Sequence, residues 1–139
     1  MKIDFAAKPA ANAAVQVVLV AEGGKLGARA EGLDKSLSGA LQRGLALPRF
    51  KGKKGEVADI LAPAGSALRR VIILGLGAAK EIDALSLRES GGALAAHLLA
   101  EFEGAAIVLV DAVKGAKLDE AQIAAELALG ASLRNYRLS

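Results

Sequence analysis

The sequence predicts an α/β fold, a three-layer sandwich in which helices cover both faces of a mixed, mostly parallel sheet. Three continuous apolar runs have the length and β-branched content of buried strands, namely residues 15–20 (VQVVLV), 71–76 (VIILGL) and 105–111 (AAIVLVD). Segments with helical periodicity alternate with these runs, an order typical of strands joined by crossover helices. The 139 residues have the length of one domain, so we treat 1–139 as a single domain.

The amino-terminal third is expected to hold two strands and a helix. Residues 1–5 (MKIDF) alternate polar and apolar side chains, which predicts an edge strand before the buried run 15–20. The glycines of EGGKLG end that run. Leucines at steps of four predict a helix from Leu33 to Leu45, and Pro48 stops it.

The middle of the chain is expected to hold a hairpin and a central strand. Residues 49–63 (RFKGKKGEVADILAP) predict two short strands around a lysine-rich turn. Residues 71–76 form the clearest central strand, and Gly75 and Gly77 mark its carboxyl end.

Two further helices are predicted in the carboxyl-terminal half. Ser86 and Glu89 have capping-box spacing, so a helix is expected to begin at Ser86, with Gly91 and Ala95 bringing it close to the sheet. A second cap at 119–122 predicts a last helix that runs to about residue 133. The residues expected to point inward are Leu87, Leu94, Leu98 and Phe102 in the first helix, and Ile123, Leu127, Gly130 and Leu133 in the second.

The composition excludes several classes of protein. There is no cysteine, so disulfides and thiolate metal sites are excluded, which fits the cytoplasmic location that we expect. No stretch reaches the roughly 18 consecutive apolar residues of a membrane span, so no membrane contact is expected. The net charge of +3 is a mild excess, whereas dedicated nucleic-acid binders concentrate basic residues on one face or arm.

Arg49, Lys51, Lys53 and Lys54 form the densest basic cluster, and glycines between them leave the backbone accessible. One interpretation is contact with phosphates, including those of a nucleic acid, or with acidic residues of a neighbouring subunit. The other, which we favour, is a solvated hairpin tip, because Phe50 is the only aromatic side chain among the lysines.

The segment from Gly75 to Gly77 begins like a dinucleotide fingerprint, but Lys80 stands where the third glycine should fall. A tight turn at the strand exit is the favoured interpretation. The alternative is a loop that cradles phosphate with Gly75, Gly77 and the backbone amides before Lys80. His97, the only histidine, is expected to be a boundary or surface residue, because a lone histidine cannot form a metal site without carboxylate partners.

Four segments in order carry a resemblance to a known family. RFKGKKGEVADILAP precedes a strand, RRVIILGLG ends in a G-L-G turn, GGALAAHL lies on a helix, and ALGASLRNYR closes the last helix. Together they resemble the amino-terminal domain of leucyl (cytosol) aminopeptidases, over essentially the whole chain. Leu138 and Ser139 depart from the pattern, since the family usually has Phe and Asp there.

The resemblance implies a fold similar to macro domains, followed in the complete protein by a larger, carboxy-terminal catalytic domain. It implies a homohexameric metallo-exopeptidase that releases amino-terminal residues with two divalent ions, manganese or zinc. The family's metal signature, similar to N-T-D-A-E-G-R, has no counterpart here, so we assign no catalytic residue, metal ligand or cofactor to this chain. The acidic residues are scattered, and most, such as Asp34, lie off the predicted apolar stripes.

We therefore expect a non-catalytic domain that serves assembly and access to the active site, with peptide substrate reached only through the full-length enzyme. Three alternatives stay open. The chain could be a short protein that has lost its enzyme domain, a macro-like module that binds ADP-ribose or another nucleotide, or a nucleic-acid-binding domain that acts through residues 49–54.

Overall fold

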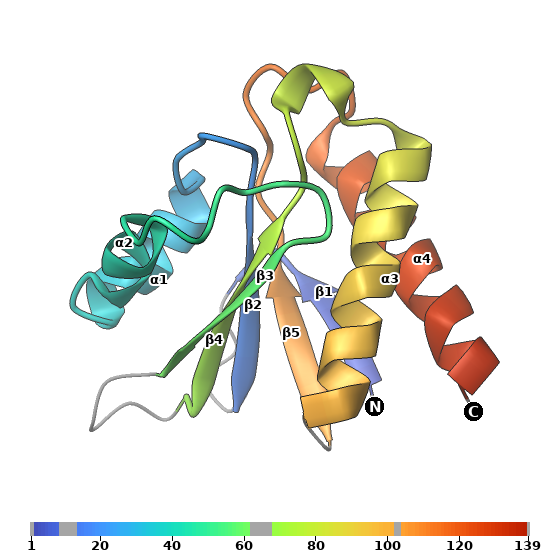
Figure 1. Ribbon diagram of the computed structural model, residues 1–139, viewed down its shortest axis with the longest axis horizontal. Helices are drawn as coiled ribbons and strands as arrows, with labels where there is room; N and C mark the ends of the chain where they lie inside the picture. The colour runs from blue at the N-terminus through green and yellow to red at the C-terminus, as the bar shows by residue number, and fades with distance from the viewer. Residues whose placement is uncertain (1, 9–13, 62–67, 102–103, 139) are drawn as a thin grey trace.

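The sheet is five-stranded, mixed and mostly parallel, as the sequence predicts (Figure 1). The computed structural model describes residues 2–8, 14–61, 68–101 and 104–138. The strand order is β1-β5-β2-β4-β3, and all neighbours are parallel except β3 and β4. The predicted edge strand at the amino terminus is confirmed. The strands are β1 (Lys2–Ala6), β2 (Val15–Val20), β3 (Val57–Leu61), β4 (Arg70–Gly75) and β5 (Ala105–Leu109).

Helices cover both faces of this sheet, which confirms the three-layer sandwich (Figure 1). One face carries α1 (Ala28–Ser36) and α2 (Ala40–Leu45). The other carries α3 (Ala84–Glu101) and α4 (Glu120–Leu138), which lie side by side, and the short η1 (Ala79–Glu81) links β4 to α3. The apolar residues of β2 alternate between these two faces, so both sides of this central strand are buried.

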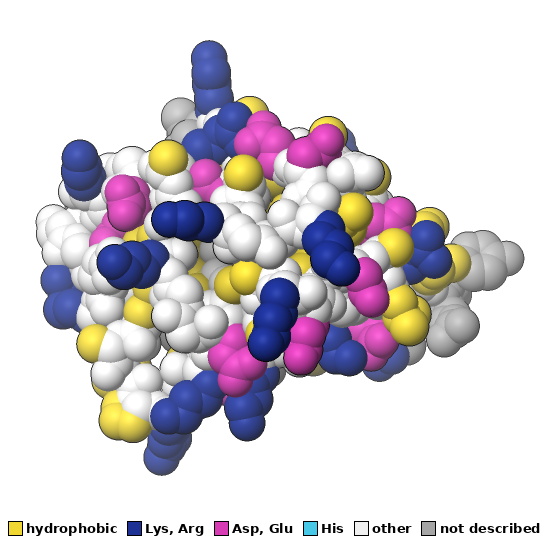
Figure 2. Space-filling model, turned by 90° about the horizontal axis from the view of Figure 1, so that it is seen from above, with side chains coloured by type: hydrophobic (Ala, Val, Ile, Leu, Met, Phe, Trp, Pro, Cys, Tyr) yellow, Lys and Arg dark blue, Asp and Glu magenta, His cyan; other side chains and the backbone are white. Residues whose placement is uncertain are grey.

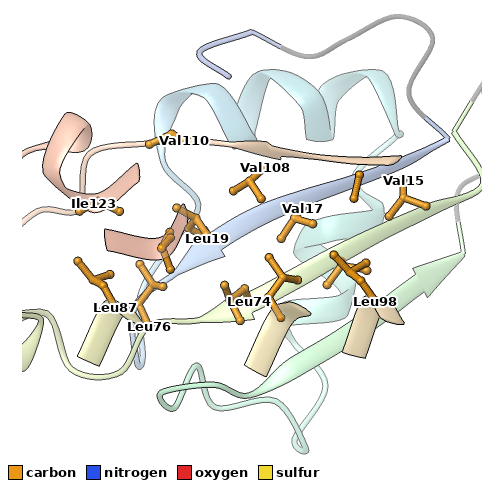
Figure 3. Packing of buried hydrophobic residues seen from close by; sticks show 14 of the residues in the cluster. Val15, Val17, Leu19, Leu74, Leu76, Leu87, Leu98, Val108, Val110 and Ile123 are labelled. Carbon is orange, nitrogen blue, oxygen red and sulfur yellow. The ribbon is translucent and has the colours of Figure 1, made fainter. Parts of the chain in front are cut away.

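The core beneath α3 and α4 contains most of the inward residues predicted from periodicity (Figure 3). Burying one such leucine or isoleucine contributes about 1.5–3 kcal/mol. Two of the described residues are exceptions: Leu133 is half exposed, and Gly130 packs against α3. Phe102 lies outside the described residues. The helix residues of this core cluster are Leu87, Leu94 and Leu98 of α3 and Ile123 and Leu127 of α4.

The helix predicted from Leu33 to Leu45 begins earlier and is interrupted. Ser38 (φ 56°) and Gly39 (φ 79°) adopt left-handed backbone conformations, which end α1 before α2 begins. The Asp34 carboxylate accepts hydrogen bonds from the backbone amide of Leu41 (2.7 Å) and from that of residue 42 (3.4 Å), and so caps α2. Asp34 is buried, so the prediction that it lies off the buried stripe of its helix is wrong. Its carboxylate turns inward to bind the amides of the next helix.

Residues 49–61, the described part of the segment 49–63, do not form the predicted hairpin of two strands. Residues 50–56 run as a loop, and the one strand that follows, β3, pairs antiparallel with β4. Because β3 runs against its neighbour, its amino end lies where the parallel strands have their carboxyl ends. The lysine-rich loop is thereby brought to the same edge of the sheet as the turn that follows β4.

α3 begins at Ala84, two residues before the predicted start. Asp83 is its cap: the Asp83 carboxylate accepts from the Ser86 amide (2.8 Å), and the Ser86 hydroxyl accepts from the Asp83 amide (3.0 Å). The predicted cap of α4 is confirmed by the same reciprocal pair between Asp119 and Gln122 (2.8 and 2.9 Å).

Glycines allow α3 and α4 to approach each other closely. A methyl group at Gly91 would overlap the carbonyl oxygen of Leu127, and one at Gly130 would overlap the carbonyl oxygen of Arg88. The prediction that Gly91 brings its helix close to the sheet is therefore wrong, because this glycine faces the neighbouring helix.

Candidate functional site

The two candidate segments singled out in the sequence, the basic loop and the glycine turn, lie against each other. The amide of Gly77 donates to the carbonyl oxygen of Gly52 (2.9 Å), and the amide of Gly55 donates to that of Gly75 (3.0 Å). A side chain at position 75 would overlap the backbone of residues 52–53. Gly75 is therefore required by this close approach of two backbones, as a tight strand-exit turn demands.

The backbone amides of the basic loop are bound by a carboxylate of the same loop. One oxygen of Glu56 accepts from the amides of Lys51 (2.9 Å), Gly52 (2.9 Å) and Lys53 (3.1 Å). Burial alone would raise the pKa of Glu56, but these three donors and the charge of Lys53 outweigh it and hold the pKa below its ordinary value. The loop thus forms an anion-binding nest that its own glutamate fills.

A hollow of about 310 Å³ lies between the glycine turn, the end of the basic loop and the start of α3. Lys53 and Lys54 line it, and Lys54 forms an ion pair with Glu89 (Nζ–Oε2 3.0 Å). Arg49, Lys51 and Lys80 are exposed and do not line it. Carboxylates outnumber the lysines, since the acidic lining residues are Glu22, Glu81, Asp83 and Glu89.

This balance of charge does not favour phosphate binding in the hollow. The amides of residues 75, 76 and 77 already donate to carbonyl oxygens within the chain. Figure 2, which views this end of the molecule, shows basic and acidic side chains interspersed over its surface. Arg49, Lys51 and Lys53 are exposed, so they are accessible to a partner. Their contact with acidic residues of a neighbouring subunit stays a prediction.

A second crevice, of about 440 Å³, lies between the loops that follow β2 and β5. These neighbouring strands lead to helices on opposite faces of the sheet, and such a switch point is where open α/β folds usually bind ligands. Its lining is mostly apolar, with Lys25 and Lys114 among the residues that form it. Sequence reasoning did not single out this crevice.

The helix amino terminus beside this crevice is occupied by a carboxylate of the chain. Asp111 is buried, and its two oxygens accept from the backbone amides of Arg29 and Ala30, each at 2.9 Å. The Arg29 guanidinium bonds Glu120 (2.8 Å), which raises the pKa of Arg29 despite partial desolvation. A ligand phosphate cannot take this position on α1 while Asp111 holds it. The sequence carries no local signal for this role, because Arg29 and Ala30 lie 82 and 81 residues from Asp111.

His97 is half-buried at the border of the apolar stripe of α3, as predicted. Its Nε2 is 2.8 Å from a carboxylate oxygen of Asp59, and the pair joins α3 to the edge strand β3. Within the described ranges, no three His, Asp or Glu side chains are grouped so that they could hold a metal ion. None of the helices described is both long enough and apolar enough to cross a bilayer.

A model of the amino-terminal domain of the cytosol aminopeptidase family matches residues 17–139, which is most of the chain. The chain belongs to this family. A probable cytosol aminopeptidase of Chelativorans sp. is 37% identical over 134 residues, covering 96% of this chain and 26% of that protein. One from Xanthobacter autotrophicus is 34% identical over 134 residues, again covering 96% and 26%. The chain thus spans about a quarter of the length of these aminopeptidases.

Solved structures agree on the fold. A tomato leucine aminopeptidase mutant superimposes with a TM-score of 0.64 at 21% identity, covering 96% of this chain and 28% of that one. The macrodomain of Mycobacterium tuberculosis DarG superimposes with a TM-score of 0.63 at 12% identity, covering 94% of this chain and 90% of that one. The macro-domain-like architecture expected of an aminopeptidase amino-terminal domain is therefore confirmed.

Proposed function

We propose that this chain is the non-catalytic amino-terminal domain of a leucyl aminopeptidase, a cytoplasmic metallo-exopeptidase that releases amino-terminal residues from peptides. The observation that carries the proposal is that nearly the whole chain aligns with about a quarter of each cytosol aminopeptidase relative. In this proposal, peptide hydrolysis takes place in the remaining three quarters. This domain serves assembly of the enzyme, as a hexamer, and access to the active site.

The described residues do not fit the two divalent ions, manganese or zinc, that the family implies. A bridged metal pair needs several carboxylates that converge on one point and are free to coordinate. The buried carboxylates here, Asp34 and Asp111, instead accept backbone amides at the starts of α2 and α1. The proposal therefore places both metal ions outside the described residues and assigns no step of hydrolysis to this domain.

The arrangement of the loops supports a role in contact with other parts of the enzyme. Glu56 holds the backbone of residues 51–53 in one conformation, so the exposed Lys51 and Lys53 are presented on a fixed loop. Exposed lysines on a fixed loop lose less conformational freedom on meeting acidic residues of a partner than lysines on a mobile one. We propose that this loop, with Arg49 and Lys54, faces a neighbouring subunit.

The test is a full-length hybrid in which this chain replaces the aligned quarter of the Chelativorans sp. enzyme. We expect the hybrid to assemble to the same size as the unaltered enzyme and to release amino-terminal leucine when manganese is added. Light scattering measures the size, and leucine p-nitroanilide turnover measures the activity. A hybrid that folds as two independent units, without assembly or activity, would contradict the proposed function.

A further inference from the structure

The outer face of the second half of α3 is apolar, and part of it is open to solvent, since Leu99 is 36% exposed. Between Ser90 and Glu101, His97 is the only polar side chain of this helix. The inner residues of that stretch, Leu94, Ala95 and Leu98, are completely buried. Toward the outside the helix presents glycine, alanine and leucine. A stretch of helix that is apolar on nearly every side is normally buried, so the outer side of residues 91–100 has the composition of an interface.

A groove of about 660 Å³ runs along this face between α3 and α4. Two leucines at its border protrude into solvent: Leu85 is 64% exposed and Leu133 is 50% exposed. Leu129, one turn before Leu133 on α4, is 41% exposed. Small residues form the floor of the groove, namely Gly92, Ala93, Ala96 and Gly130.

Charged residues border the groove but do not fill it. Arg88 is held by Glu126 (2.7 Å) and Glu89 by Lys54 (3.0 Å), so each charge at this end has an intramolecular partner. Arg134 is exposed at the other end. An apolar centre with a polar border is the usual anatomy of a protein–protein interface. Leu85 and Leu133 line the same groove, and exposed apolar side chains that gather on one face are typical of an interaction site.

The place of the groove in the chain indicates what covers it. The family model describes this domain as amino-terminal, and the relatives are about four times as long as the aligned region, so most of a relative's chain lies beyond the equivalent of α4. Leu133 and Arg134 belong to the last turns of α4, which ends at Leu138. A segment that continues from α4 starts beside the groove and reaches it without a long linker.

We propose that the groove between α3 and α4 is the surface on which the carboxy-terminal catalytic part of the full-length aminopeptidase docks, with Leu85 and Leu133 as its anchors. This inference rests on the proposed function, and it adds the face through which the two parts meet. Docking covers the apolar side of α3 and holds the two domains in one orientation.

The experiment uses the full-length hybrid described above, with Leu85→Glu and Leu133→Glu introduced together. Leu47→Glu is the matched control, because Leu47 is 61% exposed and does not line the groove. Trypsin cleavage between the two domains reports docking, since a docked junction is protected. We expect the double substitution to raise the cleavage rate about tenfold and Leu47→Glu to change it less than twofold. Circular dichroism of the 139-residue chain should be the same for all variants, because the substituted side chains are exposed.

Equal cleavage rates for the double variant and the Leu47→Glu control, in a hybrid that assembles and is active, would overturn the docking surface and leave the proposed function intact. An unsubstituted hybrid that does not assemble would overturn both. A second copy of this chain is the other molecule that could fill the groove, and the oligomeric state of the isolated chain tests for it. We expect a monomer by light scattering, whereas a dimer that Leu85→Glu and Leu133→Glu dissociate would assign the groove to self-association and overturn the proposal.

Discussion

Asp111, which follows β5, binds the backbone amides at the start of α1. Substituting it tests whether the buried carboxylates of this domain are structural caps. The substitution Asp111→Ala deprives the amides of Arg29 and Ala30 of their acceptors. The bond to Ala30 is buried, and the bond to Arg29 is partly buried. Each unsatisfied buried donor costs about 1–3 kcal/mol, and the more accessible amide can recover part of this from water. We expect a loss of about 2–4 kcal/mol.

This loss exceeds the ordinary cost of removing a helix cap, about 1 kcal/mol, because the carboxylate also meets the positive end of the α1 dipole away from solvent. Urea unfolding followed by circular dichroism at 222 nm measures it. With a slope of about 1.5–2 kcal/mol per molar urea, the midpoint should fall by about 1–3 M. Asp111→Asn keeps one acceptor oxygen and should lie between the wild type and Asp111→Ala.

The control is Asp4→Ala, because the Asp4 side chain is half exposed and its nearest cation, Lys2, is 3.8 Å away. An exposed pair of this kind contributes about 0–1 kcal/mol. If Asp111→Ala proved no more destabilising than Asp4→Ala, the carboxylate would not be a structural cap, and a binding role at the crevice beside it would have to be considered.

Three further predictions follow from the same contacts. Gly130→Ala should destabilise the chain by about 1–3 kcal/mol in urea unfolding, because its methyl group would overlap the Arg88 carbonyl. Gly32→Ala is the control: position 32 has open space inside α1, so this substitution should stabilise the chain by about 0.5–1 kcal/mol. Equal effects of the two substitutions would contradict the close crossing of α3 and α4. Glu56 has a lowered pKa, so its stabilising effect is complete above its ordinary pKa of about 4.5 and fades as the pH falls through the lower folded value. Glu56→Gln should therefore cost about 1 kcal/mol at pH 7 and progressively less in acid, and a difference that does not change with pH would refute this. Titration calorimetry with ADP-ribose should give no heat of binding, because the chain's own carboxylates fill the helix terminus at Asp111 and the nest at Glu56; saturable binding would show that another site serves nucleotides.

The inner strands were predictable because a strand that is buried on both faces is apolar at nearly every position. The runs at 15–20 and 71–76 are continuous and apolar, and the structure places them as neighbouring inner strands. The pairing of β3 was not predictable in the same way. Val57, Ile60 and Leu61 indicate a strand, but no local feature says whether its partner is the preceding lysine-rich segment or the following strand.

The helix from Leu33 illustrates a different limit. Leu33, Leu37 and Leu41 are all buried, so the leucines at steps of four correctly predicted core residues. They did not predict the break between α1 and α2. The stripe continues across the break because the chain re-enters the helix with the same face inward. Gly39 was the available signal, since glycine adopts the left-handed conformation without steric cost; Ser38, which has a Cβ, gives no such signal.

The carboxylates explain why the candidate site was only partly predictable. The basic loop and the glycine turn were both visible in the sequence, but their mutual contact depends on the antiparallel direction of β3. The partners of Asp111 lie 81 and 82 residues away, so its role could not be read from local spacing. The role of Glu56 is local in sequence, because its carboxylate binds amides only three to five residues earlier. An acidic residue shortly after a glycine-containing loop was therefore an available signal.

The most direct test of the account is the peptidase activity of the 139-residue chain by itself. The purified chain should release no leucine from leucine p-nitroanilide or from a leucyl peptide when manganese or zinc is added, under conditions in which the full-length Chelativorans sp. enzyme turns over. Metal-dependent release that follows the chain through successive purification steps and rises in proportion to its concentration would contradict the account, because the catalytic centre would then lie within these residues.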